Sequence, residues 1–219
     1  MTIKADRGTC FVFDLDDTLY YEIDFLKSAY KSIAFAIEPE SHTRLFNEML
    51  KVFRSGANTF EYLIERFPEK NLTRENLLYL YRNHLPEIAL KKGVLEILIK
   101  IKNNKGRTGI ITNGRSITQR NKIKALGIEQ FIDETIISEE VGYEKPGESV
   151  FRYFPEKTGE QFYYFGDNMN KDFIAPKKLG WCCIGVLDKK NIHSQNISDF
   201  SIEYLPHIFI NMFTEIEII

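Results

Sequence analysis

The chain has 219 residues, with 29 Lys and Arg against 31 Asp and Glu, and 43% of its residues are hydrophobic. This composition is typical of a globular protein, and the near-balance of charge does not favour binding to a nucleic-acid polymer. No apolar run approaches the roughly 18 residues that a membrane helix needs, so no membrane partner is expected. A polar N-terminus and three cysteines without disulfide or zinc spacing favour a cytoplasmic protein.

Four short segments predict buried strands of a parallel sheet, because they are rich in β-branched and aromatic residues and do not alternate with polar ones. They are Thr9–Phe13, Thr108–Ile111, Thr135–Ile137 and Phe162–Phe165, with Cys183–Val186 and Phe200–Ile202 as further candidates. Helical patterns lie between strands at Gly93–Asn104, Ser116–Leu126 and Asp172–Leu179, and Ser116 and Gln119 have the spacing of a capping box. The alternation predicts an α/β fold, a Rossmann-like parallel sheet flanked by helices.

A long stretch after the first strand contains no predicted strand. Four amphipathic helices are predicted there instead, at Asp24–Ile37, Ser41–Phe53, Asn58–Phe67 and Thr73–Asn83. We therefore expect an α/β core formed by residues 1–20 and 87–219, and a helical subdomain formed by residues 21–86.

The ends of the four predicted strands carry polar residues of complementary kinds. In chain order they are Asp14-Leu15-Asp16-Asp17-Thr18, Thr112-Asn113-Gly114, Lys145-Pro146, and Gly166-Asp167 with Asp172 five residues on. Acids just past a buried strand must be solvated, paired or bound to a cation. Since ligands of open parallel sheets bind at the carboxyl ends of the strands, these residues are candidates for one site.

Each segment taken alone also has an ordinary explanation. The acids could form a solvated loop, the Thr-Asn-Gly segment a turn, Lys145 a surface charge, and Asp172 a helix cap. Only the joint set, on four successive strand ends, favours a site.

This joint set resembles the motifs of the haloacid dehalogenase-like hydrolase superfamily. Its four motifs are matched by Asp14, Asp16 and Thr18, then by Thr112, then by Lys145 and Pro146, and finally by Gly166, Asp167 and Asp172. The inserted helices are similar to the first-type cap of these enzymes. Residues 16–19, 112–114 and 137–146 also resemble the subgroup that includes pyrimidine 5′-nucleotidases.

The resemblance implies a phosphatase with four catalytic residues. Asp14 would be the nucleophile that takes the phosphoryl group as an aspartyl-phosphate. Asp16 would be the general acid for the leaving alcohol and then the base for water, and we expect neighbouring carboxylates to raise its pKa. Thr112 would orient the phosphoryl oxygens, and Lys145 would neutralise charge on them.

The resemblance also implies the groups that bind phosphate and metal. Phosphate would be bound by Thr112, Asn113, Gly114 and Lys145. Mg²⁺ would be bound by Asp14, Asp167 and Asp16, the last through its backbone carbonyl, with Asp172 acting through water and Thr18 through hydrogen bonds within the loop. We further expect an excess of acid, with mainly Lys145 facing Asp14, Asp16, Asp17, Asp167 and Asp172.

The function implied is hydrolysis of a small phosphorylated metabolite, a nucleotide or a sugar phosphate, by a monomer or homodimer. Asp16 argues against a 2-haloacid dehalogenase, because those members of the superfamily lack an acid at that position. The alternatives are a phosphomutase with the same residues and a different cap, a receiver-like phosphoprotein, and a binding protein that has lost activity.

Overall fold

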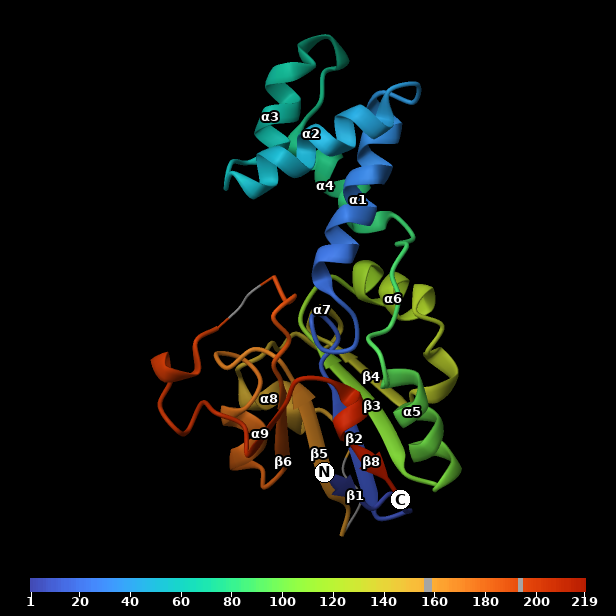
Figure 1. The fold of residues 1–219 in the computed structure, drawn as a ribbon, viewed down its shortest axis with the longest axis vertical. Coiled ribbons are helices and arrows are strands. Elements are labelled where there is room, and N and C mark those ends of the chain that lie inside the picture. The colour runs from blue at the N-terminus through green and yellow to red at the C-terminus, as the bar shows by residue number, and fades with distance from the viewer. Residues whose placement is uncertain (156–158, 193–194) are drawn as a thin grey trace. The chain divides into compact units, whose positions relative to one another are not determined.

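The structure is a computed structural model that describes residues 1–155, 159–192 and 195–219 (Figure 1). Its contacts divide the chain into two compact units, Met1–Glu22 with Ala89–Ile219, and Ile23–Ile88. The bounds of these units lie two residues beyond those expected from the sequence. We propose that the second unit is the cap.

A six-stranded sheet forms the centre of the first unit, and every neighbouring pair of its strands is parallel. Its strands are β2 (Thr9–Phe13), β3 (Arg107–Thr112), β4 (Glu134–Ile137), β5 (Gln161–Gly166), β6 (Cys182–Val186) and β7 (Ile208–Ile210), in the spatial order β4-β3-β2-β5-β6-β7. The first five confirm the predicted strands to within one residue at either end. The α/β fold class is confirmed.

The sixth predicted strand, Phe200–Ile202, is wrong. This segment follows a 3₁₀ turn at Ile197–Asp199, and the side chain of Ile202 is 83% exposed. The edge position beside β6 is taken by β7, where Ile184 is in register with Ile208. An apolar composition allows a segment to form a strand. Which of two such segments does form one is decided by pairing with the edge of the sheet.

The order of the strands places a topological switch between β2 and β5. The chain builds the sheet outward from β2 through β3 to β4, and then returns to the other side of β2 to form β5, β6 and β7. Helices α5 (Val94–Asn103) and α6 (Ser116–Ala125) lie to one side of the sheet, and α8 (Glu148–Arg152) and α9 (Ile174–Lys178) to the other (Figure 1). Such a switch leaves a crevice beyond the carboxyl ends of the strands.

The core of this unit is aromatic. The rings of Phe162 and Trp181 are stacked with centroids 4.6 Å apart, and Phe151 meets Trp181 edge-on at 5.9 Å. Three elements carry no signal in the sequence: the paired two-residue strands β1 (Thr2–Ile3) and β8 (Glu217–Ile218), and the short helix α7 (Ser138–Val141). Strands this short form because the rest of the fold brings their backbones together.

The second unit is helical, as the sequence predicts. Its helices are α1 (Glu22–Ile37), α2 (His42–Arg54), α3 (Thr59–Arg66) and α4 (Arg74–Asn83), with a 3₁₀ turn at Pro68–Lys70. Its core consists of fully buried side chains that recur at helical spacing: Ile33, Ala34, Leu45, Met49, Leu63 and Leu77. Two helices have side-chain caps, since Asn58 accepts from the N–H of Phe60 at 3.0 Å and Thr73 from that of Asn76 at 3.1 Å.

None of the helices in the described ranges combines the length and the apolar character that a membrane crossing requires.

Candidate active site

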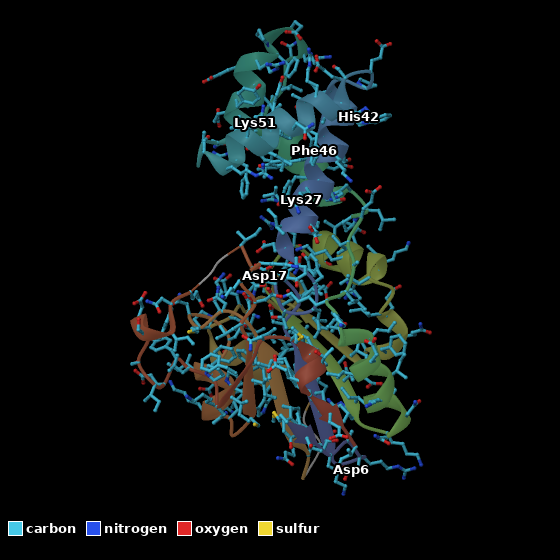
Figure 2. All side chains as sticks on the ribbon, in the orientation of Figure 1. Asp6, Asp17, Lys27, His42, Phe46 and Lys51 are labelled. Atoms are coloured by element: carbon cyan, nitrogen blue, oxygen red, sulfur yellow. The ribbon has the colours of Figure 1, made fainter. Side chains whose placement is uncertain are left out.

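The first strand ends in a buried carboxylate. Asp14 continues the ladder beyond β2, its N–H donating to the carbonyl of Phe165 at 2.8 Å, and the residue is 6% exposed. Its Oδ1 accepts from Lys145 Nζ at 2.5 Å, and its Oδ2 accepts from Thr18 Oγ1 at 3.3 Å. Figure 2 marks the loop that follows at Asp17. Asp14 is thus held on both oxygens by residues of two different strand ends.

Lys145 joins the first strand end to the fourth. Its Nζ also donates to Asp172 Oδ1 at 2.7 Å and to the Tyr164 hydroxyl at 3.1 Å. Asp172 is 1% exposed, and its Oδ2 accepts from the N–H of Asn168 at 2.8 Å. Helix α9 begins at Ile174, so Asp172 is a hub of the buried network rather than the cap of that helix.

Three carboxylates meet at this point. Oxygens of Asp14, Asp167 and Asp172 all lie within 4.8 Å of one another. Burial raises the pKa of Asp14 to about 7, against the opposing charge of Lys145, and raises the pKa of Asp167 well above its ordinary value. Lys145 is itself held in the charged form, because Asp14 and Asp172 raise its pKa despite its burial. The single ammonium of Lys145 thus faces three carboxyl groups. A hard divalent cation would neutralise the remaining negative charge.

Gly166 is needed here for space rather than for a turn. A Cβ on this residue would lie 2.7 Å from the Cβ, Cγ and Oδ2 of Asp172. We expect Gly166→Ala to displace Asp172, to lower the free energy of unfolding by about 1–3 kcal/mol, and to lower turnover with it. Urea unfolding and steady-state kinetics check this. A variant with the stability and activity of the wild type would contradict the close approach.

Asp16 lies apart from the three carboxylates and has a cation of its own. Lys122 Nζ donates to its Oδ1 at 2.6 Å, Gln119 Nε2 donates to its Oδ2 at 2.8 Å, and the Tyr20 hydroxyl donates to Oδ1 as well. Burial alone would raise the pKa of Asp16, but the charge of Lys122 and these hydrogen bonds outweigh it and hold that pKa below its ordinary value. The expectation of a raised pKa is therefore wrong, because the nearest charge is a cation rather than another carboxylate.

The predicted capping box at the start of α6 is also wrong. The helix begins at Ser116 with Arg115 as its N-cap, and it is the Glu139 side chain that accepts from the N–H of Ser116, at 2.7 Å. Ser116 Oγ donates instead to Glu140 Oε1 at 2.5 Å. Gln119 is 1% exposed and its side chain contacts Asp16, so the spacing that suggested a cap belongs to the site.

A pocket opens between the acids, with Asp14, Asp16 and Asp167 among its lining residues. The second strand end is only partly directed at this pocket. Thr112 is 1% exposed, and its Oγ1 accepts from Gln119 Nε2 at 2.6 Å. Asn113 lines the pocket, but its side chain is hydrogen-bonded to the backbone of Lys145. Its Oδ1 accepts from the Lys145 N–H and its Nδ2 donates to the Lys145 carbonyl, both at 2.9 Å. The N–H of Gly114 donates to Ser138 Oγ at 3.0 Å, so the structure does not bring that group to the pocket.

Asp17 lines the same pocket as the other four acids, but its carboxylate is occupied by backbone groups. Its two oxygens accept from the N–H groups of Glu22 and Ile192, each at 2.8 Å, and Lys91 Nζ donates to its backbone carbonyl. The expected excess of acid with mainly Lys145 opposite is therefore corrected. Lys122 and Lys91, both buried, add two cations that the motifs do not include.

Glu22 also lines the pocket. Burial and the negative charge of Asp16 raise its pKa to about 7, against an ordinary value of 4.5. Because the folded protein holds this proton more tightly than the unfolded chain, the group costs stability as the pH rises from about 4.5 to about 7. In EDTA, we expect Glu22→Gln to gain on the order of 2 kcal/mol over the wild type between pH 5 and pH 8.

Urea unfolding at pH 5, 6, 7 and 8 measures this difference. The exposed Glu96→Gln is the matched control, and its difference from the wild type should stay constant with pH. Parallel pH profiles for Glu22→Gln and the wild type would show that the carboxyl group is not destabilised by its surroundings.

Sequence reasoning missed the residues that surround the acids. They are Tyr20, Gln119, Lys122 and Tyr164, all buried. A weak signal existed for two of them, because Gln119 and Lys122 stand three apart on a helix that follows a site strand, and so share one face. Tyr164 lies inside an apolar strand, where nothing in the sequence separates it from a core residue.

Residues 11–186 match the family described as haloacid dehalogenase-like hydrolase. The chain belongs to this family. The predictions of the family and of a hydrolase of the phosphatase type are confirmed.

Two curated relatives share about the same identity with this chain. The glyceraldehyde 3-phosphate phosphatase of Methanocaldococcus jannaschii is 30% identical over 219 residues, which cover 90% of this chain and 93% of that protein. The pyrimidine 5′-nucleotidase YjjG of Escherichia coli is 30% identical over 186 residues, which cover 77% of this chain and 81% of that protein.

Solved structures share the fold. The putative hydrolase YfnB of Bacillus subtilis, solved bound to magnesium, superposes with a TM-score of 0.63 at 18% identity, covering 96% of this chain and 97% of that one. A putative β-phosphoglucomutase from Thermotoga maritima has a TM-score of 0.62 at 19% identity, covering 92% and 94%.

Proposed function

We propose that this hydrolase is a Mg²⁺-dependent phosphomonoesterase that cleaves a small phosphorylated metabolite through an aspartyl-phosphate on Asp14. The observation that carries the proposal is the meeting of three groups at one point. Asp14 Oδ1 lies 2.5 Å from Lys145 Nζ, and the carboxylates of Asp14, Asp167 and Asp172 gather within 4.8 Å. This brings together a nucleophile, a cation for the phosphoryl oxygens and a set of hard oxygen ligands.

The donor set fits Mg²⁺, because all its ligands are oxygens and its acids outnumber its cation. Asp14 and Asp167 would be direct ligands, together with the backbone carbonyl of Asp16. Asp172 already accepts from Lys145, Tyr164 and Asn168, which suits a role through water. When bound, the cation would neutralise charge that builds up on the phosphoryl oxygens. YfnB, which shares the fold, was solved with magnesium bound.

The reaction follows from the positions of two acids. A carboxylate oxygen of Asp14 attacks phosphorus, and the bond from phosphorus to the leaving oxygen breaks. Because Lys122 holds the pKa of Asp16 low, Asp16 must take up a proton from solvent before this step. It then gives that proton to the leaving oxygen and later takes one from the water that hydrolyses the aspartyl-phosphate. The hydroxyl of Thr112 accepts from Gln119, so its single proton remains to donate to a phosphoryl oxygen.

The pocket beside the acids has a volume of about 170 Å³. Small-molecule pockets usually measure about 300–1,000 Å³, so this one suits the phosphoryl group and its nearest atoms rather than a whole nucleotide. The curated relatives are named for a triose phosphate and for pyrimidine nucleotides. We therefore propose phosphomonoesters of short sugars and of nucleosides as the two substrate classes.

A substrate panel tests the proposed function. The protein is incubated with p-nitrophenyl phosphate, sugar phosphates and nucleoside monophosphates, with Mg²⁺, and inorganic phosphate is measured. We expect release of phosphate, reduced by about 10²–10⁴-fold in Asp16→Asn with alkyl esters. Isomerised sugar phosphate without free phosphate would indicate a phosphomutase instead. No turnover of any ester would favour a protein that has lost activity.

A further inference from the structure

The Asp16 carboxylate accepts hydrogen bonds from three side chains that lie outside the motifs of the site. Tyr20 and Lys122 donate to its Oδ1, the latter from 2.6 Å, and Gln119 donates to its Oδ2 from 2.8 Å. Both carboxylate oxygens therefore have fixed partners. The group cannot turn about its Cβ–Cγ bond without losing a charge-assisted hydrogen bond.

The partners of Asp16 also hold each other. Lys122 Nζ donates to Gln119 Oε1 at 2.8 Å, and because an ammonium only donates, this contact fixes which end of the Gln119 amide faces Asp16. Lys122 and Gln119 are 4% and 1% exposed and lie three residues apart on α6. The same Gln119 amide reaches Thr112, so one helix face orients two residues of the site.

Stability does not account for a buried Lys at this position. A buried ion pair gains little over apolar residues of similar volume, because both charges lose their hydration. Orientation offers a reason, since proton transfer requires the donor to face the leaving oxygen within hydrogen-bond reach.

We propose that Lys122 is a positioning residue for proton transfer by Asp16, acting directly on its carboxyl group and through Gln119. This inference rests on the proposed phosphomonoesterase activity. In the first step, Asp14 forms a bond to phosphorus while the bond from phosphorus to the leaving oxygen breaks, and its electron pair stays on that oxygen. Asp16, which must first have taken up a proton from solvent, delivers that proton to the same oxygen and becomes the carboxylate that Lys122 and Gln119 contact.

The need for this proton depends on the leaving group. p-Nitrophenolate leaves as a stable anion at neutral pH, whereas phenolate is more basic and gains more from protonation as the bond breaks. The two aryl phosphates differ only in a nitro group remote from phosphorus. A misplaced Asp16 therefore costs more with phenyl phosphate, while general damage to the site costs the same with both.

The test compares kcat/KM for these two esters, because this parameter reports the steps up to formation of the aspartyl-phosphate. We expect Lys122→Met to lose at least about 10-fold more on phenyl phosphate than on p-nitrophenyl phosphate. Lys122→Arg should recover part of the difference. Lys124→Met, an exposed Lys of the same helix, should behave as the wild type with both esters.

Three results would overturn the inference. Equal losses on the two esters would mean that Lys122 only supports the fold, and no loss on either would mean that it plays no part. A wild-type protein that cleaves neither ester would refute the proposed function and this inference together. An active wild type with equal losses in Lys122→Met refutes the inference alone.

A second measurement needs neither metal nor turnover. Thermal unfolding in EDTA is compared for the wild type, Lys122→Met, Asp16→Asn and the double variant. We expect Lys122→Met to lower the midpoint more beside Asp16 than beside Asn, because only the carboxylate is left buried without its cation. Equal shifts would refute the pairing. Should Lys122→Met fail to fold, Gln119→Met replaces it in the ester comparison, with the same expectation.

Discussion

Replacing Asp14 by Asn should abolish turnover, with a loss in kcat on the order of 10⁴-fold or more. The amide cannot form the bond to phosphorus that the carboxylate forms. The substitution keeps the shape of the side chain, and its carbonyl can still accept from Lys145, which donates to Asp14 Oδ1 at 2.5 Å. We therefore expect the variant to be folded, with an unfolding midpoint in EDTA no lower than that of the wild type.

Phosphate release from p-nitrophenyl phosphate and thermal unfolding measure the two expectations. Asp199→Asn, an exposed acid of the same unit, is the matched control and should retain wild-type turnover. A folded Asp14→Asn with wild-type turnover would show that the nucleophile lies elsewhere. A loss of turnover that accompanied unfolding would leave the catalytic role without support, and Asp14→Glu, which keeps the charge but moves it, would then be measured.

Removing Mg²⁺ should lower kcat by at least about 10³-fold, and adding it back should restore activity. The same cation should stabilise the fold, because it binds the gathered carboxylates of the native state and not the unfolded chain. At a concentration 100-fold above Kd the gain is about 2.7 kcal/mol. Asp167→Asn removes one of the three carboxylates and should lose most of this response.

Thermal unfolding with increasing Mg²⁺, and turnover in EDTA, are the measurements. Asp199→Asn should respond to Mg²⁺ like the wild type. An unfolding midpoint that does not change with Mg²⁺, together with full activity in EDTA, would show that Lys145 alone balances the acids.

Most of the sheet could be predicted because its strands are buried on both faces. Thr9–Phe13 reads as a strand without help from the rest of the chain, since burial of both faces requires a continuous apolar run. Phe200–Ile202 has similar composition but lies at the surface, and Ile208–Ile210 pairs with the edge instead. Local composition reports what a segment could bury and not which partner it finds.

The motif residues of the site could also be placed from the sequence, because parallel strands end at one edge of the sheet. Asp14, Lys145 and Asp172 follow different strands, and the structure brings a carboxylate oxygen of Asp14 and one of Asp172 within 2.7 Å of Lys145 Nζ. The topology could not reveal which side chains surround each charged group. The pKa of Asp16 was expected to rise and is lowered, because Lys122 arrives from a helix face 106 residues away in the chain.

The sequence by itself therefore determined the fold class, the helical insertion, the family and the acids at the strand ends. These follow from patterns that are local in the chain or repeat along it. Only the tertiary structure decided the balance of charge. Lys122 lies beside Asp16, Lys91 contacts the carbonyl of Asp17, and Gly166 leaves space for Asp172. Electrostatic interactions depend on distance in space, and that distance is fixed only when strands and helices pack together.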